Sequence, residues 1–465
     1  MNFEMIGIVF YVLVMLVVGF VVSRSIKTDA DYFLAGRSLG PVLATFSIFA
    51  TWFGAETCIG TAGAVYKYGI SGLHADPLGY SACIFIMGFV FSKVLWNKKI
   101  TTIPDLFHHR FSPNVERLAA IIMIPSSIIW AGAQIRAFGT IISTTSEITF
   151  VNGVTAAALV VMIYTICGGM LADAYNDLIQ GIGIIIGLGF LLFVIVQDLG
   201  GIEAALSKIS PERLKLGTPD GGERSFLGNL EFWMVPILGS VMAQELVGRV
   251  VYSRTEKVAF NSCMRAGVIY FMVGMVPVFV GLLGLVYVPG LKDSEAIMPL
   301  LARTHLSTFG YVMFVGALVS AILSTVDSTL LSVSALISHN LVHPSFPNLT
   351  EWQKVLVARS GVLISGLIAY GIAFTSDSIT GLVELASSLG GPSILVMTSI
   401  ALFVKKGNAI NAVYAFVGSI VTWALCHFVF EMEFPVLMTV VMCGACYFGS
   451  LLITRKSREE EMVTN

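Results

Sequence analysis

The sequence predicts an all-α protein that crosses a membrane about thirteen times, and three observations support this prediction. Hydrophobic residues make up 56% of the chain and charged residues 12%, whereas soluble domains contain about 25% charged residues. Long apolar runs recur along the chain, and each reaches roughly the 20 residues that a helix needs to cross the hydrocarbon core. A membrane β-barrel would instead show alternating segments of about 10 residues.

The apolar runs define the predicted membrane-spanning helices in order. The first begins directly after Glu4 without a basic leader, so we expect it to be retained rather than cleaved. The connecting loops are short, so residues 1–465 are expected to form a single transmembrane domain. The predicted spans lie at 3–23, 41–67, 73–97, 116–145, 149–167, 171–197, 228–251, 261–289, 307–341, 354–374, 379–404, 409–430 and 434–454.

The distribution of positive charge predicts the orientation of these spans. Lys and Arg gather in the loops after the first, third, seventh, eleventh and last spans. The positive-inside rule then places the N-terminus outside and the C-terminus in the cytoplasm. The connection at 198–227 is predicted to be an ordered outer loop or short surface helix; it carries basic residues against the rule, together with balancing acids. Compact loops without targeting signals favour a bacterial inner membrane, and the net charge of −2 argues against nucleic-acid binding.

The second predicted span contains features of a broken helix. Gly54, Gly60 and Gly63 run through its middle and Glu56 lies near the expected midplane. Glycine inside a helix costs about 1 kcal/mol relative to alanine, and unsatisfied backbone at membrane depth persists only where it lines a cavity or is buried in protein. We therefore expect a break that faces an internal site, with close helix packing through small residues as the alternative.

The ninth predicted span is rich in hydroxyl groups. Helical spacing places Ser324 and Ser328 on one face, next to Thr325, and Asp327 lies between them. Such hydroxyls can simply bond to preceding carbonyls, but an aspartate at membrane depth is costly and usually functional. Oxygen ligands suit hard cations, so this span and the broken helix together could bind a sodium ion.

Four stretches of the chain carry a resemblance to a known family. They are DYFLAGRSLG at 31–40, the broken second span, YTICGGMLADAYNDLIQ at 164–180 and SAILSTVDS at 320–328. Over nearly the whole chain this ordered set resembles the sodium:solute symporter family. The resemblance implies sodium-coupled symport of a small organic solute by alternating access. It also implies a LeuT-like core of two inverted repeats, approximately 41–197 and 228–404, with peripheral helices at 3–23, 409–430 and 434–454.

The resemblance also implies cation ligands. It places a sodium ion between backbone carbonyls and hydroxyl groups, and in some members a second cation lies beside an aspartate of the sixth span. Asp327 stands where those members often have serine, so a second ion or a proton is the expectation there, and a helix-terminal acid near the cytoplasmic face is the alternative for Asp177. The implied sodium ligands are the carbonyls of Ala50, Phe53 and Ala321 and the hydroxyls of Ser324 and Thr325, and the second position comprises Asp177, Ser324 and Ser328, with Asp327 as a further candidate.

The solute is expected to bind between the broken spans. WFGAET and IIWAGAQ resemble the choline-transporting branch, in which tryptophans face a quaternary ammonium, but Ala243 stands where that branch has another tryptophan. Buried acids could attract an amine, stay protonated or pair with Arg136 or Arg249, although Arg249 is expected to anchor at the interface. The candidate solute-binding residues are Trp52, Glu56, Thr57, Trp130, Gln134, Gln244 and Glu245, with lipid-facing or packed positions as the alternative for Trp52 and Trp130.

A second class of function remains open at this point, namely a transporter-like membrane sensor that acts with a separate signalling partner. An enzyme is not expected, because the chain lacks H-E-x-x-H and Walker-type motifs. Cys443 and Cys446 form a C-x-x-C inside an apolar span, which favours packing over metal or redox chemistry. The expected partners are therefore a small organic solute, Na⁺ and the lipid bilayer, and the sequence predicts no particular oligomeric state.

Overall fold

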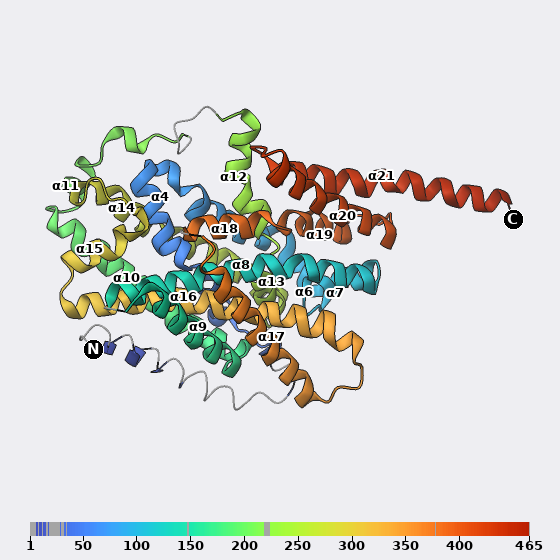
Figure 1. The fold of residues 1–465 in the computed structure, drawn as a ribbon, viewed down its shortest axis with the longest axis horizontal. Helices are drawn as coiled ribbons and strands as arrows, with labels where there is room; N and C mark the ends of the chain where they lie inside the picture. The colour runs from blue at the N-terminus through green and yellow to red at the C-terminus, as the bar shows by residue number, and fades with distance from the viewer. Residues whose placement is uncertain are drawn as a thin grey trace.

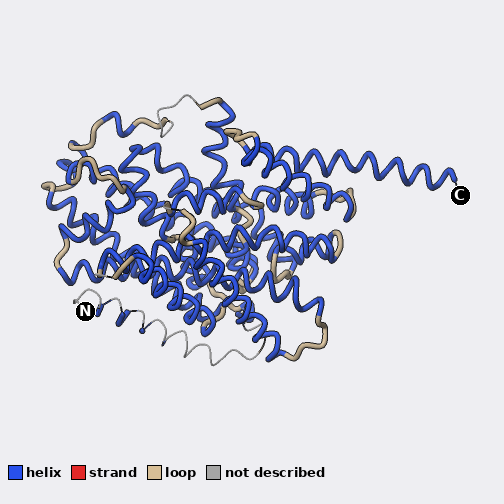
Figure 2. The backbone as a smooth tube through the Cα atoms, viewed as in Figure 1, coloured by secondary structure: helices blue, strands red, loops and turns tan. Residues whose placement is uncertain are grey.

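The structure, a computed structural model, describes residues 35–146, 148–217, 224–376 and 378–464, together with scattered positions before residue 35. Every regular element in these ranges is a helix, as Figures 1 and 2 show, so the predicted all-α fold class is confirmed. The seven cysteines are free thiols.

The helices of the first half of the chain include several short and broken pieces. They are α3 (Pro41–Trp52), η2 (Glu56–Gly60), α4 (Thr61–Tyr68), η3 (Gly69–Leu73), η4 (His74–Gly79), α5 (Tyr80–Ile86), η5 (Met87–Ser92), α6 (Lys93–Lys98), α7 (Ile103–Arg110), α8 (Pro113–Thr145), α9 (Phe150–Cys167), α10 (Met170–Asp198), α11 (Ile202–Ser207) and η6 (Pro211–Leu214).

The second half contains longer helices and two further breaks. Its elements are α12 (Phe226–Ser240), α13 (Gln244–Val251), α14 (Glu256–Tyr287), η7 (Ser294–Ala296), α15 (Ile297–His305), α16 (Thr308–Ala335), η8 (Leu336–Val342), η9 (His343–Ser345), α17 (Glu351–Ile372), α18 (Ile379–Ser388), α19 (Gly391–Phe403), α20 (Ala409–Ala424), η10 (Leu425–Val429) and α21 (Pro435–Thr464).

The described residues contain 10 helices that are long and apolar enough to span a membrane, or 11 if the bent pair α12 and α13 counts as one span. The predicted first span at 3–23 lies mostly outside the described residues. The predicted second and third spans appear as α3 followed by a helical stretch of 43 residues, Glu56–Lys98. A straight helix of that length would measure about 65 Å, twice the roughly 30 Å hydrocarbon core. The stretch leaves helical geometry at Gly69 and Asp76, which divides it into two passes.

Helix α16 lies at the centre of the packing. It contacts α8, α10, α17 and α3, and α10 also packs against α3. Helices α20 and α21 lie side by side at one end of the molecule, and the last part of α21 extends away from it (Figure 1). Most residues of α16 are buried, as are all five residues of η2, which follows the end of α3.

The breaks in α12–α13 and α18–α19 bring two backbones into close contact. An added Cβ at Gly239 would lie 2.0 Å from the Ser387 carbonyl oxygen, and one at Gly391 would lie 2.0 Å from the Gly239 carbonyl oxygen. Only glycine permits this approach. It places the hydroxyl groups of Ser240 and Ser387 3.4 Å apart, on the wall of an internal cavity described below.

The connection at 198–227 is ordered in its described part, as predicted. It contains α11 and η6, and Arg213 donates hydrogen bonds to the carbonyls of Val65, Tyr66 and Lys67 at the end of α4. A basic side chain there adds hydrogen bonds to the carbonyl groups of the last helical turn, some of which have no partner within the helix.

Candidate functional site

Helix α3 ends at Trp52, and the chain is non-helical at Phe53 and Gly54 before helical structure resumes. Phe53 has φ −86° and ψ 71°, which turns its carbonyl out of the helical direction. In the described part of the chain, no backbone N–H donates to the carbonyl oxygens of Ala50 and Phe53. The predicted break is therefore present, and it leaves two buried carbonyl oxygens available to a ligand.

A hydroxyl group of α16 lies against this break. An added Cβ at Gly54 would lie 2.9 Å from Thr325 Oγ1, 2.9 Å from Gln134 Oε1 and 2.6 Å from Glu56 Oε2. Thr325 Oγ1 also donates to the Ala321 carbonyl oxygen at 3.1 Å, which leaves its lone pairs free. The break and the hydroxyl-rich helix, expected to meet, are thus adjacent in the structure.

Ser324 points in another direction from Thr325. Its hydroxyl donates to Asp177 Oδ1, and Ser47 donates to Asp177 Oδ2 at 2.5 Å. Asp177 is fully buried and lies two turns inside α10, so it is not an exposed acid at a helix end. Among the five implied sodium ligands, Ser324 is the one whose hydroxyl is already held by a carboxylate.

A buried arginine occupies the centre of the neighbouring acidic network. Arg249 is fully buried, which contradicts the expectation that it anchors at the membrane interface. Its guanidinium pairs with Asp173, lies 3.8 Å from Asp177 and donates to Ser328. An unpaired cation would be too costly to bury at this depth, and the two carboxylates make its burial possible.

Asp327 and Ser328 belong to the same network but differ in their contacts. Ser328 donates to both carboxylate oxygens of Asp173, at 3.1 and 3.2 Å, and lies 3.2 Å from Thr51 Oγ1. Asp327 is buried, and neither of its oxygens has a hydrogen-bond partner in the described part of the chain. Asp173 and Asp177 thus contact one arginine, and Asp327 adds a third carboxylate near Asp173, which leaves an excess of negative charge if all are ionised.

Glu56 is held by neutral donors rather than by an arginine. It accepts hydrogen bonds from Trp130 Nε1 at 3.1 Å and from Gln134 Nε2 at 2.5 Å, while Gln134 Oε1 accepts from the Ala55 N–H at 2.9 Å. The expected alternative partner, Arg136, instead donates to the Ala373 carbonyl at 3.1 Å. Glu56 therefore remains without a cationic partner among these contacts.

Aromatic rings surround the same region. Trp52 contacts Trp130 edge to face with ring centroids 5.9 Å apart, and it contacts Tyr80 in the same way at 5.3 Å. Both tryptophans are buried, so neither faces lipid.

Two of the predicted solute-binding residues have structural partners. The Thr57 hydroxyl lies 2.7 Å from Tyr270 Oη, and Tyr270 also donates to Asp76. Gln244 Oε1 accepts from the Ile103 N–H at 2.9 Å, which ties α13 to the start of α7. The prediction missed Asp76 and Tyr270, because an aspartate next to proline and a lone tyrosine look like ordinary turn and packing residues.

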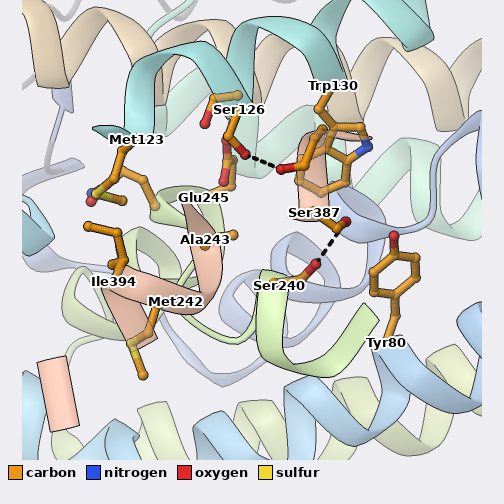
Figure 3. Close-up of a pocket in the computed structure, with 15 residues that line it drawn as sticks. Tyr80, Met123, Ser126, Trp130, Ser240, Met242, Ala243, Glu245, Ser387 and Ile394 are labelled. Atoms are coloured by element: carbon orange, nitrogen blue, oxygen red, sulfur yellow. Dashed lines mark hydrogen bonds between the residues drawn. The ribbon is translucent and has the colours of Figure 1, made fainter. Parts of the chain in front are cut away.

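Two cavities lie beside the break. The first, here called the Glu245 cavity, is formed where α8, the α12–α13 break and the α18–α19 break meet (Figure 3). The second, the Glu56 cavity, adjoins it, because Tyr80 and Ser387 line both. Lining residues of the Glu245 cavity include Trp130, Ser240, Ala243, Gln244 and Ser387, and those of the Glu56 cavity include Thr61, His74, Asp76, Thr380 and Glu384.

A separate polar cluster connects α7, α8 and η8. Asn340 Nδ2 donates at 2.8 Å to both Asp105 and Glu116, and His339 Nε2 lies 3.2 Å from Asp105. Burial alone would raise the pKa of Asp105, but His339 and the backbone N–H groups of Thr101 and Thr102 lower it to about 2. These hydrogen bonds join α7 and α8 to η8.

The sequence is similar to one known family along most of its length. The profile of the sodium:solute symporter family matches residues 32–421. Human high affinity choline transporter 1 is 27% identical over 441 residues, which cover 89% of this chain and 74% of that protein. The sodium/pantothenate symporter of Haemophilus influenzae is 25% identical over 392 residues, covering 82% and 81% of the two chains. The sodium/proline symporter of Salmonella typhimurium is 25% identical over 441 residues, covering 89% and 86%.

The similarity of this chain to solved structures is stronger in fold than in sequence. A Na⁺-coupled sialic acid symporter in a substrate-bound outward-open state superposes with a TM-score of 0.85 at 18% identity, covering 97% of this chain and 98% of that one. Mhp1, a nucleobase-cation-symport-1 family transporter in a closed conformation, gives a TM-score of 0.65 at 14% identity, covering 94% and 96%. The LeuT-like fold expected for this chain is thereby confirmed.

Proposed function

The chain belongs to the sodium:solute symporter family and carries a small organic solute across a membrane together with sodium, and we propose that its sodium ion binds at the break after α3. The proposed ligands are the carbonyl oxygens of Ala50, Phe53 and Ala321 and the hydroxyl groups of Ser324 and Thr325. The observation that supports this most strongly is that Thr325 Oγ1 lies only 2.9 Å from the point where an added Cβ of Gly54 would stand.

The chemistry of these ligands suits sodium and electrical coupling. All five are neutral oxygen atoms, and hard cations prefer oxygen. The bound ion therefore keeps its charge, and the membrane potential pulls it inward by about 2.3 kcal/mol per 100 mV. This free energy drives accumulation of the solute.

The solute is proposed to bind in the two cavities, next to the ion. Gln134 and Glu56 connect the two sites, because both side chains touch the position of Gly54 and both belong to the solute region. If sodium binding changes the break, it therefore also shifts the Glu56 carboxylate, which Trp130 and Gln134 hold in place. We propose Trp130, Glu56 and Glu245, which line the cavities, as solute contacts, together with Trp52 and Gln134, which pack against them. Gln244 also lines the Glu245 cavity, although its amide oxygen has another partner, and Thr57 lies outside the lining of both cavities beside Tyr270.

A second cation position is proposed at Asp177, Ser328 and Asp327. The excess of aspartates over arginine in this network supports it. Arg249 supplies one positive charge, so a further sodium ion or a proton would offset part of the negative charge that remains.

The wider organisation is also proposed from the family. The core comprises two inverted repeats, 41–197 and 228–404, and the helices at 3–23, 409–430 and 434–454 are peripheral. The protein lies in a bacterial inner membrane with its N-terminus outside and its C-terminus in the cytoplasm. The bacterial symporter relatives and the distribution of basic loops support this arrangement.

The sodium assignment is tested with a matched pair of substitutions on α16. Thr325→Val keeps the side-chain shape and removes the proposed ligand, whereas Thr329→Val removes an equally buried hydroxyl one turn further on, which donates only to the Thr325 carbonyl. Sodium-dependent thermal stabilisation of the purified protein reports binding, because a ligand that binds the native state raises its apparent stability. We expect Thr325→Val to raise the half-saturating sodium concentration at least tenfold and Thr329→Val to leave it unchanged.

Uptake into proteoliposomes then distinguishes a transporter from a sensor. An inward sodium gradient is expected to drive solute uptake in the wild type and in Thr329→Val, and to drive little in Thr325→Val. Equal uptake in all three would refute the site. A protein that binds solute and never moves it would support the sensor alternative.

A further inference from the structure

Glu245 is a buried carboxylate without a hydrogen-bond partner. Its side chain is 0% exposed, it lines the Glu245 cavity (Figure 3), and neither oxygen has a hydrogen-bond partner within bonding geometry in the described part of the chain; Ser127 lines the same cavity. Buried charges in folded proteins are normally paired, because an unpaired one is very costly. Glu245 also lies in the first turn of α13, where the helix dipole favours a negative charge.

The nearest basic side chain is already used elsewhere. Arg249 lies one turn further along α13 and donates to the backbone carbonyl of Glu245 at 3.4 Å. Its ion pairs are with Asp173 and Asp177 of α10. None of the residues that line the Glu245 cavity is Lys, Arg or His.

The adjoining Glu56 cavity has the same charge character. Glu56, Asp76 and Glu384 line it, and His74 is the one basic residue type among its walls. Asp76 accepts from Tyr270, and Glu56 accepts from Trp130 and Gln134, so both carboxylates are held by neutral donors. An anionic solute would meet repulsion in both cavities, whereas a cation would be attracted.

On the premise of the proposed symport, we propose that the solute is an organic cation that carries at least one N–H group, and that Glu245 accepts a hydrogen bond from it. A carboxylate without donors is satisfied by an N–H, which a quaternary ammonium does not possess. A quaternary ammonium would instead need aromatic faces around it. The Glu245 cavity offers Trp130 and Tyr80 on one side, but Ala243 and Met242 on the other (Figure 3).

Four small probes test the charge and the N–H group separately. Each carries a hydroxymethyl group, and they differ in the group at the other end. Ethanolamine carries an N–H cation, choline a quaternary cation, ethylene glycol no charge and glycolate an anion. Each is titrated against the purified full-length protein in sodium, with thermal stabilisation as the readout. We expect ethanolamine to half-saturate at a concentration at least tenfold below choline, and ethylene glycol and glycolate to give no shift.

Substitutions then assign the effect to Glu245. Glu245→Gln keeps the size and removes the charge, and a charge-assisted hydrogen bond of about 1.5–3 kcal/mol corresponds to a loss of affinity of roughly ten- to hundredfold. Glu245→Asp keeps the charge and withdraws it, so a smaller loss is expected, and it replaces the first variant if that one fails to fold. Glu203→Gln, at an exposed acid of α11, is the control and is expected to change nothing. Sodium alone should stabilise all three.

Several results would overturn this inference. They are choline binding as tightly as ethanolamine, a shift with glycolate, the absence of any shift with ethanolamine at millimolar concentration, and equal ethanolamine affinity in Glu245→Gln. Sodium-driven uptake of an anion would remove the inference and leave the proposed symport in place. Ethanolamine binding that needs Glu245 but is independent of sodium and never leads to uptake would remove the proposed symport and leave the role of Glu245 in place.

Discussion

Replacing Gly54 by alanine tests the sodium site with a single added carbon atom. The new Cβ would lie 2.6 Å from Glu56 Oε2 and 2.9 Å from both Gln134 Oε1 and Thr325 Oγ1, all closer than van der Waals contact allows. Gly54 does not have a positive φ, so alanine meets no backbone strain there. The three obstructing atoms are all ends of side chains, which can rotate away.

The magnitude of the effect follows from this geometry. Inserting a methyl group into a packed core costs about 1–3 kcal/mol, and the movable side-chain ends favour the lower part of that range. The fold should therefore survive. Displacing Thr325 Oγ1 from the break removes one oxygen ligand of the ion, and a loss of about 1.5–3 kcal/mol corresponds to a roughly ten- to hundredfold weaker sodium affinity.

The assay is a sodium titration of thermal stability, with potassium replacing sodium to keep the ionic strength constant. Gly189→Ala in α10 is the control, because an added Cβ there meets no atom within 4 Å. It should raise stability slightly, since alanine favours a helix by about 0.5–1 kcal/mol, without changing sodium affinity. Unchanged sodium affinity in Gly54→Ala would refute the reasoning, because the ion could not then depend on the groups beside this residue.

Three further predictions concern the buried charges. Arg249→Met should destabilise the protein by about 3–5 kcal/mol in chemical denaturation, because it leaves Asp173 and Asp177 buried without their cation; a loss below about 1 kcal/mol would show that the pair is unimportant. Asp177→Asn should lower the number of sodium ions moved per solute in a reversal-potential measurement if the second position exists, whereas a purely structural acid would alter stability and leave the ratio intact. Asp105, with its pKa lowered to about 2, contributes stability that is complete at pH values above about 4 and is lost as the pH falls toward 2. Asp105→Asn should therefore lower the free energy of unfolding by about 2 kcal/mol at neutral pH and reduce its decrease between about pH 4 and about pH 2. The same decrease over that pH range in both proteins would contradict the role of His339 in the pKa shift.

The local pattern of the sequence predicted the helix break well. Gly54 and the glycines after it, with Glu56 among them, marked a span that could not remain a regular helix, and the chain is non-helical at Phe53 and Gly54. That Thr325 lies beside this break could not be read from periodicity. It came from the resemblance to a family, since residues this far apart in sequence meet only through the tertiary fold.

The pairing of buried charges was the least predictable part. Arg249 looked like an interface residue because it lies near the end of its span, but Asp173 and Asp177 neutralise it from α10. A signal was available in α10, where Asp173, Asn176, Asp177 and Gln180 recur at helical spacing in an apolar helix and all four are buried. Such a polar stripe indicates a buried polar interface, although it does not identify the partner.

The location of the bound ion tests the central claim most directly. A high-resolution structure of the protein in sodium should show density for a monovalent cation between the break after α3 and Thr325, within coordination distance of the Ala50 and Phe53 carbonyl oxygens. The density should disappear when sodium is replaced by a large organic cation. Sodium-dependent solute binding with the ion density elsewhere, and none at the break, would contradict the account.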